Sequence, residues 1–156
     1  MVESHPIVIR SATLSDAQIM PAIQSYLVRE ECHVLVASRR DSETPAAFGV
    51  LDLVGRVTHP NDPTVALHFA EQPPDFDHLG SPLLLRLIER AEQLGIGRLT
   101  AGWDPMDATG LRFWERHGFC PSGAMPYFEQ GPGTVQYVSG YQDATGSTLD
   151  LIANLR

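Results

Sequence analysis

Short apolar runs of strand length recur along most of the chain. Their alternation and their content of Val, Ile and Leu predict strands over residues 7–10, 33–37, 47–54, 65–70 and 99–103. A turn-forming Asn61-Asp62-Pro63 separates the runs AFGVLDLV and VALHFA. The middle of the chain is therefore predicted to be an antiparallel meander.

Helical spacing of apolar residues marks two regions on either side of the meander. The first begins at Ser15-Asp16 and runs to about residue 29, with room for one long helix or two very short ones. The second follows an acidic turn. We predict that Ser81 caps it, that Pro82 is its first helical residue and that it ends at a glycine of the GIG sequence 95–97.

A third helix and several short elements are predicted after the strand over 99–103. Asp107 suits the N-cap of a helix that runs to His117, and Gly118 suits its end. Strands are expected over 119–120, 125–129 and 135–141. We expect one domain over 1–142, followed by a tail over 143–156 with a short helix from Thr148.

Composition narrows the class of protein. The chain has 156 residues, of which 43% are hydrophobic and 19% charged, as in a folded domain rather than a disordered chain. A net charge of −8 disfavours partners such as nucleic acid or an anionic membrane. No apolar run is long enough to cross a membrane, and MVESHPIVIR has no secretory signal. A cytoplasmic setting is expected.

Cysteine and histidine usage disfavours a metal site. The two cysteines, Cys32 and Cys120, form no CxxC pair, which also disfavours a disulfide framework. The six histidines are scattered along the chain without the spacing of metal ligands. We therefore expect no bound metal, and we look for candidate chemistry among the acidic, aromatic and glycine residues.

The run GSPLLLRLIERAEQLGIGRLTAGWDPMDATGLRFWERHGFCPSG resembles the core of the GNAT (Gcn5-related N-acetyltransferase) superfamily. Two parts carry the resemblance: a helix that opens at Gly80-Ser81, and a strand–loop–helix that ends in RFWERHGF. Residues 9–17 are similar to the first strand and helix start of that family, and residues 47–50 to its third strand. The resemblance therefore extends over most of the chain.

The resemblance implies an α/β fold with a central mixed sheet and helices on both faces. It implies that acetyl-CoA lies where two parallel strands splay apart, with its pyrophosphate on backbone N–H groups at the helix start. The implied function is an acyl-CoA-dependent N-acyltransferase, in which an amine of a small molecule or peptide attacks the thioester directly. A homodimer is compatible with it. By position, the implied cofactor-binding residues are Ala70, Glu71, His78, Leu79, Gly80, Ser81, Asp107 and Trp114.

The acidic turn before the second helix departs from the family pattern. The family's phosphate loop is Arg/Gln-x-x-Gly-x-Gly/Ala, but here Asp75 takes the Arg/Gln position, His78 takes the first glycine and only Gly80 matches. Asp75 and Asp77 would repel a pyrophosphate, and Pro82 removes an N–H group near the helix start. Alternatively, the aspartates point outward and only cap the helix.

Candidate acid–base residues follow from the same comparison. Trp114 falls where the family commonly has an acidic tyrosine, and an indole cannot protonate a thiolate. We expect Glu71, at the end of the third meander strand, as the first choice of base and Asp104 as the second, with Tyr127 able to replace the missing acid. His68, in VALHFA, faces either the cleft or the other layer, and packing is its commoner role.

Two functions remain open from the sequence. One is an N-acyltransferase with an unusual cofactor loop and weakened acetyl-CoA binding. The other is a non-catalytic protein of the same fold that has lost CoA binding and now binds a ligand or a partner. Residues 75–80 are the sequence feature that distinguishes them, because their arrangement decides whether a pyrophosphate can bind at the helix start.

Overall fold

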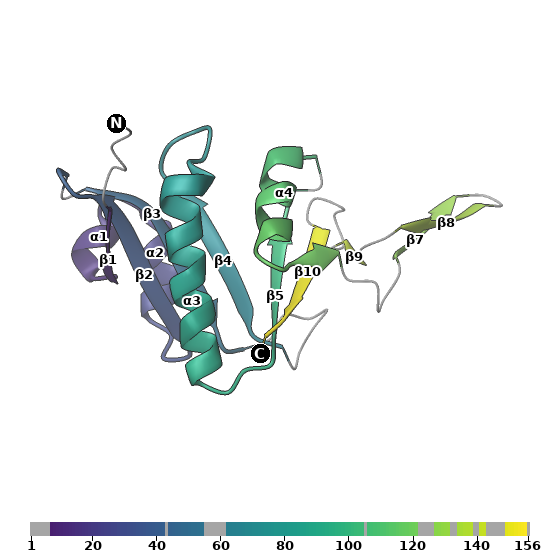
Figure 1. Cartoon of the computed structure of the whole chain (residues 1–156), viewed down its shortest axis with the longest axis horizontal. Coiled ribbons are helices and arrows are strands. Elements are labelled where there is room, and N and C mark those ends of the chain that lie inside the picture. The colour runs from purple at the N-terminus through teal and green to yellow at the C-terminus, as the bar shows by residue number, and fades with distance from the viewer. Residues whose placement is uncertain are drawn as a thin grey trace.

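The computed structural model describes residues 7–42, 44–54, 62–104, 106–121, 127–131, 134–138, 141–142 and 149–155 (Figure 1). Side chains are described up to residue 120 and again over 151–155. None of the helices in this described part has the length and apolar character needed to span a bilayer.

A meander of four antiparallel strands forms one half of the main sheet. Its strands are β1 (Ile7–Ser11), β2 (Cys32–Arg39), β3 (Pro45–Asp52) and β4 (Thr64–Phe69). The other half contains β5 (Arg98–Trp103), β10 (Leu149–Asn154) and β6 (Cys120–Pro121), in the order β1-β2-β3-β4-β5-β10-β6. The predicted meander is confirmed.

One short strand segment and a hairpin complete the described strands. β9 (Tyr141–Gln142) pairs with β10, while β7 (Tyr127–Gly131) and β8 (Thr134–Val138) form a separate antiparallel pair. The hairpin and the late strands lie close to the ranges predicted from the sequence.

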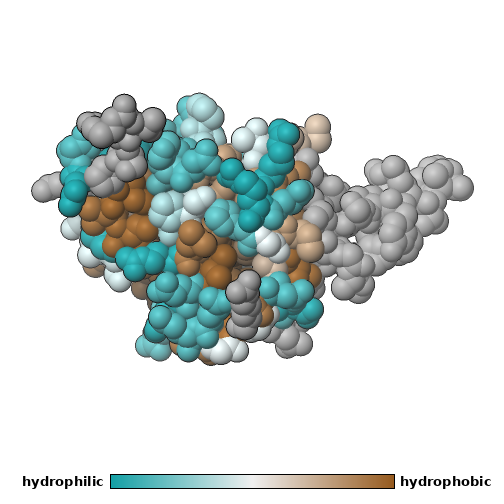
Figure 2. All heavy atoms as spheres, in the orientation of Figure 1, coloured by the Kyte–Doolittle hydropathy of each residue, from teal (hydrophilic) through white to brown (hydrophobic). Residues whose placement is uncertain are grey.

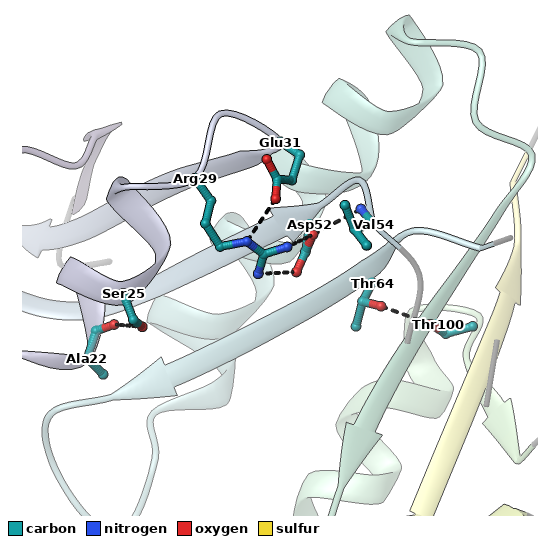
Figure 3. A network of polar contacts seen from close by, with 8 residues as sticks. All are labelled: Ala22, Ser25, Arg29, Glu31, Asp52, Val54, Thr64 and Thr100. Carbon is teal, nitrogen blue, oxygen red and sulfur yellow. Dashed lines mark hydrogen bonds and ion pairs between the residues drawn. The ribbon is translucent and has the colours of Figure 1, made fainter. Parts of the chain in front are cut away.

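β4 and β5 are parallel neighbours that meet at one end only. Their register contains the single pair Thr64 and Thr100, where the Thr100 N–H donates to the Pro63 carbonyl at 2.9 Å. The threonine hydroxyls lie 3.3 Å apart (Figure 3). Figure 1 shows the strands close at this end and parted at the other. The expected pair of diverging parallel strands is therefore confirmed.

Helices cover both faces of the sheet. α3 (Ser81–Gln93) and α4 (Ala108–Arg116) pack on one face, where Leu84, Leu87 and Ala91 of α3 are fully buried. The outward residues of α3 are exposed, and Figure 2 shows hydrophilic residues spread over this face with separate hydrophobic patches between them. The amphipathic pattern therefore orients α3 as its spacing predicts.

The first predicted helical region is two short helices rather than one long helix. α1 (Leu14–Ala17) and α2 (Ala22–Leu27) lie on the opposite face, and Ile23 is buried against Val36 and Phe48. Pro21 stands between them, and its ring and missing N–H interrupt a continuous helix. Of the two arrangements that the sequence left open, the structure has the second.

The start of α3 differs from the prediction. Ser81 is not the N-cap, because a short π-helix, η1 (Phe76–Gly80), precedes it and continues directly into α3. Buried Phe76 and Leu79 hold this segment against the core, and Asp75 caps it. The acidic turn is therefore the first turn of the helical segment, whereas a loop leading to a cap at Ser81 was expected.

The tail is also different from the prediction. A short helix was expected from Thr148, but residues 149–154 form β10, which pairs antiparallel with both β5 and β6. Leu151 and Ala153 alternate along it and are buried in the main core. β10 pairs with β5 on one side and with β6 on the other, and these pairings outweigh the local helical preference.

Candidate functional site

A pocket lies beside β4 and β5, next to the end at which the two strands are still paired. We call it the base pocket. Its volume is about 300 Å³, and it is lined by Tyr26, Val50, Asp52, Thr64, Val65, Ala66, His68 and Gly102. α2 supplies Tyr26, so the pocket lies on the face of the sheet opposite α3. Aromatic, hydroxyl and carboxylate groups converge there from four separate chain segments.

His68 is the histidine that lines the base pocket. Its ring stacks on Phe48, with centroids 4.4 Å apart, and lies 6.0 Å from the ring of Tyr26. Its Nε2 is buried and has no hydrogen-bond partner among the described residues. Burial lowers the pKa of His68, so its imidazole is neutral at neutral pH. A neutral imidazole with a free nitrogen can take up a proton.

An ion-pair network holds the wall of the base pocket beside α2 (Figure 3). The Arg29 guanidinium donates to both oxygens of Asp52, at 2.9 and 3.1 Å, and its Nε donates to Glu31 at 2.9 Å. The Asp52 carboxylate also accepts the Val54 N–H at 3.0 Å. Asp52 is thus neutralised by Arg29 and serves to fix the wall of the pocket.

Asp75 occupies the N-terminal end of the helical segment that leads into α3. Its Oδ1 accepts the His78 N–H at 3.0 Å, and its backbone carbonyl accepts the N–H groups of Leu79 and Gly80, both at 3.1 Å. Arg39 lies 3.4 Å from the other carboxylate oxygen. Burial raises the pKa of Asp75, but the His78 hydrogen bonds and Arg39 outweigh that effect and lower it.

Phe76 fills the space where β4 and β5 are parted. Its ring lies 5.4 Å from Phe69, the last residue of β4, and 5.8 Å from Trp103, the last residue of β5. It also stacks on Phe113 of α4 at 4.9 Å. Phe76 is buried in this cluster. The open ends of the two strands are therefore joined by packed aromatic rings.

Gly80, which matches the family's phosphate loop, has a packing role here. A Cβ at Gly80 would lie 3.2 Å from ring atoms of both Phe113 and Phe69. That spacing is tighter than ordinary van der Waals contact, so a larger residue would push the aromatic cluster apart. The glycine therefore lets the helix approach these rings.

A groove of about 650 Å³ separates η1 from α4. It is lined by Pro74, Asp75, Phe76, Asp77, Thr109, Arg112, Phe113, Glu115 and Arg116. Three of these residues are acidic and two are arginines, and Arg116 donates to Asp77 at 3.0 Å. The groove thus offers no excess of positive charge for an anionic ligand.

The three predicted catalytic residues lie at the ends of three different strands. Glu71 is exposed just beyond β4, and Asp104 is exposed just beyond β5, where it accepts the Met106 N–H at 2.9 Å. Tyr127 opens β7, and its side chain is outside the described part of the structure. His68 lies deeper between the strands than Glu71, since it precedes Phe69 on β4.

The predicted cofactor-binding residues fall into two groups. His78, Leu79, Gly80 and Ser81 lie together at the start of the helical segment, but the Ser81 hydroxyl hydrogen-bonds His117 Nε2 at 2.8 Å. The others are spread over the ends of β4 and β5 and over α4: Ala70, Glu71, Asp107 and Trp114. The Ala70 N–H donates to the Ala46 carbonyl at 2.9 Å and thereby extends the β3–β4 pairing.

Asp107 and Trp114 both have contacts that stabilise the fold. Asp107 caps α4 by accepting the Gly110 N–H at 3.0 Å, as predicted, and it also accepts the Trp103 indole N–H at 2.9 Å. Trp114 is fully buried, and its Nε1 has no hydrogen-bond partner among the described residues. Within those residues, no cluster of His, Cys, Asp and Glu side chains could hold a metal ion.

The start of α3 does not fit the diphosphate of acetyl-CoA, the cofactor that the fold implies. The N–H groups of residues 78–80 already donate to Asp75, and the Ser81 N–H donates to Phe76. A carboxylate stands where a phosphate would bind, and the Phe76 ring fills the gap between the strand ends. Asp75 caps the helical segment, as the second explanation from the sequence has it, but its carboxylate lies at the helix start and does not point away from it.

Solved structures of acetyltransferases share this architecture. A ribosomal-protein-alanine N-acetyltransferase from Brucella melitensis aligns with a TM-score of 0.67 and 19% identity, over 95% of this chain and 99% of that chain. A GNAT-family acetyltransferase from Streptococcus pneumoniae aligns with a TM-score of 0.65 and 15% identity, over 96% and 100%.

A third structure, from Salmonella typhimurium, was determined with its cofactor acetyl-CoA. It aligns with a TM-score of 0.61 and 17% identity, over 96% of this chain and 94% of that chain. No model of a protein family matches the sequence, and no curated protein matches it significantly. The likeness is therefore one of three-dimensional structure over nearly the whole chain. The chain has the fold of the GNAT superfamily, a mixed sheet with helices on both faces.

Proposed function

We propose that this chain is an N-acyltransferase that acts on a small amine held in the base pocket. The observation that carries the proposal is His68, which lies on β4 beyond the Thr64–Thr100 pair and whose buried Nε2 has no hydrogen-bond partner among the described residues. A pocket of about 300 Å³ is at the small end of the range for ligand sites, which favours a small-molecule amine over a peptide.

His68 has the properties of a general base. An aliphatic amine is protonated at neutral pH and becomes a nucleophile only after it loses a proton. The lowered pKa of His68 keeps its imidazole neutral and able to remove that proton. Phe48 stacks on the face of the ring, Tyr26 lies tilted beside it, and the two rings orient Nε2. In the family's chemistry, acyl-CoA would supply the acyl group as a thioester.

Glu71, Asp104 and Tyr127 remain candidates for the remaining proton transfers. Glu71 and Asp104 lie at the parted ends of β4 and β5, where water can reach them, and could relay a proton from the pocket to solvent. The proposal therefore gives Glu71 a role that is secondary to His68. A comparison of the two residues by substitution is the direct test.

The test measures acetyl transfer from acetyl-CoA to a panel of small amines by thiol release. We expect His68→Gln to lower kcat/KM by roughly 10²-fold or more, the usual contribution of a positioned base, and Glu71→Gln to lower it much less. Wild-type kcat/KM should rise with pH through the lowered pKa of His68, and His68→Gln should remove that step. Equal activity of His68→Gln and wild type at every pH would refute the assignment.

A second function is favoured by one specific observation. Asp75 and Phe76 occupy the end of the cleft where the acyl donor is expected, which suits a non-catalytic protein that binds a ligand in the base pocket alone. In that case no amine in the panel would be acetylated. Binding of amines would still be lost on substitution of His68, and calorimetry of the wild type and His68→Gln separates the two functions.

A further inference from the structure

We infer that η1 is an internal plug at the donor end of the cleft, so that an acyl-CoA binds only after Asp75 and Phe76 leave their positions. This inference rests on the proposed function, because it concerns the donor of the same reaction. Two neighbouring residues form the plug, one by charge and one by volume, and each can be tested separately.

The charged part of the plug is the Asp75 carboxylate. A helix start attracts anions because its first N–H groups lack partners and carry partial positive charge. Here Asp75 Oδ1 accepts the His78 N–H at 3.0 Å, and His78 Nδ1 lies 3.1 Å from the same oxygen. Arg39, from the end of β2, lies 3.4 Å from Oδ2. The carboxylate thus accepts a hydrogen bond from the first turn of the helical segment and forms an ion pair with Arg39.

The apolar part of the plug is the Phe76 ring. It contacts the last residues of β4 and β5 and the Phe113 ring of α4, at centroid distances of 5.4, 5.8 and 4.9 Å. These three rings come from the elements that border the opening. A ligand that extends between the parted strands would have to displace Phe76. Burial of this ring therefore opposes ligand entry even for an uncharged ligand.

The described residues that line the groove beside the plug carry no excess of positive charge for a diphosphate. Asp77 points to Arg116 at 3.0 Å, and that arginine is therefore engaged. Glu115 lines the same groove, where acidic residues outnumber arginines. A diphosphate at the helix start would lie beside the Asp75 charge. At an effective dielectric constant of about 20, two unit charges about 5 Å apart repel enough to weaken binding on the order of a hundredfold.

The experiment uses two ligands and two substitutions. Coenzyme A carries the diphosphate, whereas pantetheine has the same thiol arm and no charge. Asp75→Asn removes the charge but keeps an N-cap, because asparagine is also a good capping residue. Phe76→Ala removes the ring. Asp62→Asn is the control for net charge, since Asp62 pairs with Arg98 at 3.2 Å at the start of β5, away from the plug.

Binding is measured by calorimetry for each protein and each ligand. We expect Asp75→Asn to strengthen coenzyme A binding on the order of a hundredfold at low salt and to leave pantetheine binding unchanged. Phe76→Ala should strengthen binding of both ligands, and Asp62→Asn of neither. If Phe76→Ala does not fold, as judged by circular dichroism, Phe76→Leu takes its place with a smaller expected gain in the same direction.

Several outcomes would overturn the inference. Tight coenzyme A binding by the wild type that Asp75→Asn does not change would mean that no plug exists. Absence of binding by every variant would mean that removing the plug does not open a donor site. If the opened variants bind coenzyme A but acetylate no amine, the plug stands and the proposed acyltransferase function fails, so the two failures are distinguishable.

Discussion

Gly110 lies where α4 touches the indole ring of Trp103. A Cβ at this position would overlap Trp103 Nε1 and would lie 2.5 Å from Asp107 Oδ2. Both atoms belong to the capping arrangement in which Asp107 accepts the indole N–H. The absence of a side chain at Gly110 therefore permits the cap of α4, the end of β5 and the aromatic cluster to pack together.

Gly110→Ala should destabilise the protein by about 1–3 kcal/mol, the usual cost of overpacking, although alanine has a helix propensity about 1 kcal/mol better than glycine. The free energy of unfolding in urea measures the effect. Gly97→Ala is the matched control, because a Cβ at Gly97 would have nothing within 4 Å. Equal stability of both variants would show that the indole ring moves aside at little cost.

At the scale of elements, β10 determines how the second half of the sheet is completed. It pairs with β5 along six residues, from Leu149 with Trp103 to Asn154 with Arg98, and it separates β5 from β6. Leu151 and Ala153 face the main core, with exposed fractions of 1% and 2%. The last element in the chain is therefore a core element and a neighbour of the parted strands.

Leu151→Ala should lower the free energy of unfolding by about 2–5 kcal/mol, because it removes a fully buried side chain and leaves a cavity. Asn154→Ala, at an exposed position of the same strand, should change it by less than about 0.5 kcal/mol. Denaturant titration of both variants tests whether β10 is part of the cooperative unit. A loss below about 1 kcal/mol for Leu151→Ala would contradict the placement of β10 in the core.

At the scale of the whole molecule, three histidines in different parts of the fold have lowered pKa values. Burial lowers the pKa of His33, His68 and His117, and the charges of Arg90 and Arg116 add to the effect at the first and the last. In the unfolded chain each would titrate near the ordinary value of about 6.5. The unfolded state therefore binds more protons than the folded state just below that pH.

Stability should consequently be constant with respect to these groups above about pH 7 and should fall as the pH drops below about 6.5. The sign follows because protonation favours the state with the higher histidine pKa, which is the unfolded one. Urea denaturation at pH 7.5 and pH 5.5 measures the loss, and His68→Gln should make it smaller. A protein that becomes more stable over this range on acidification would contradict the three lowered pKa values.

Local chemistry was sufficient for much of the architecture. The period of apolar residues gave the meander, and Asp107 caps α4 as its sequence position predicted. Gly95 and Gly118 end their helices with φ values of 77° and 89°, a conformation that glycine adopts without strain. The GNAT fold was predicted from the resemblance of residues 80–123 to that family, together with the order of these elements. The capping and periodicity themselves depend on residues close together in the sequence.

The features that bear on function were decided by tertiary contacts. Residues 149–154 become a strand because β5 and β6 leave a position between them, and His68 becomes a candidate base because Tyr26 and Phe48 enclose it. Phe76 is buried because rings from β4, β5 and α4 converge on it. The sequence by itself determined most of the elements, since periodicity and capping act locally, and the resemblance of its motifs to a known family indicated the fold. Only the tertiary structure decided the base pocket and the plug, because burial and pKa depend on groups that are distant along the chain.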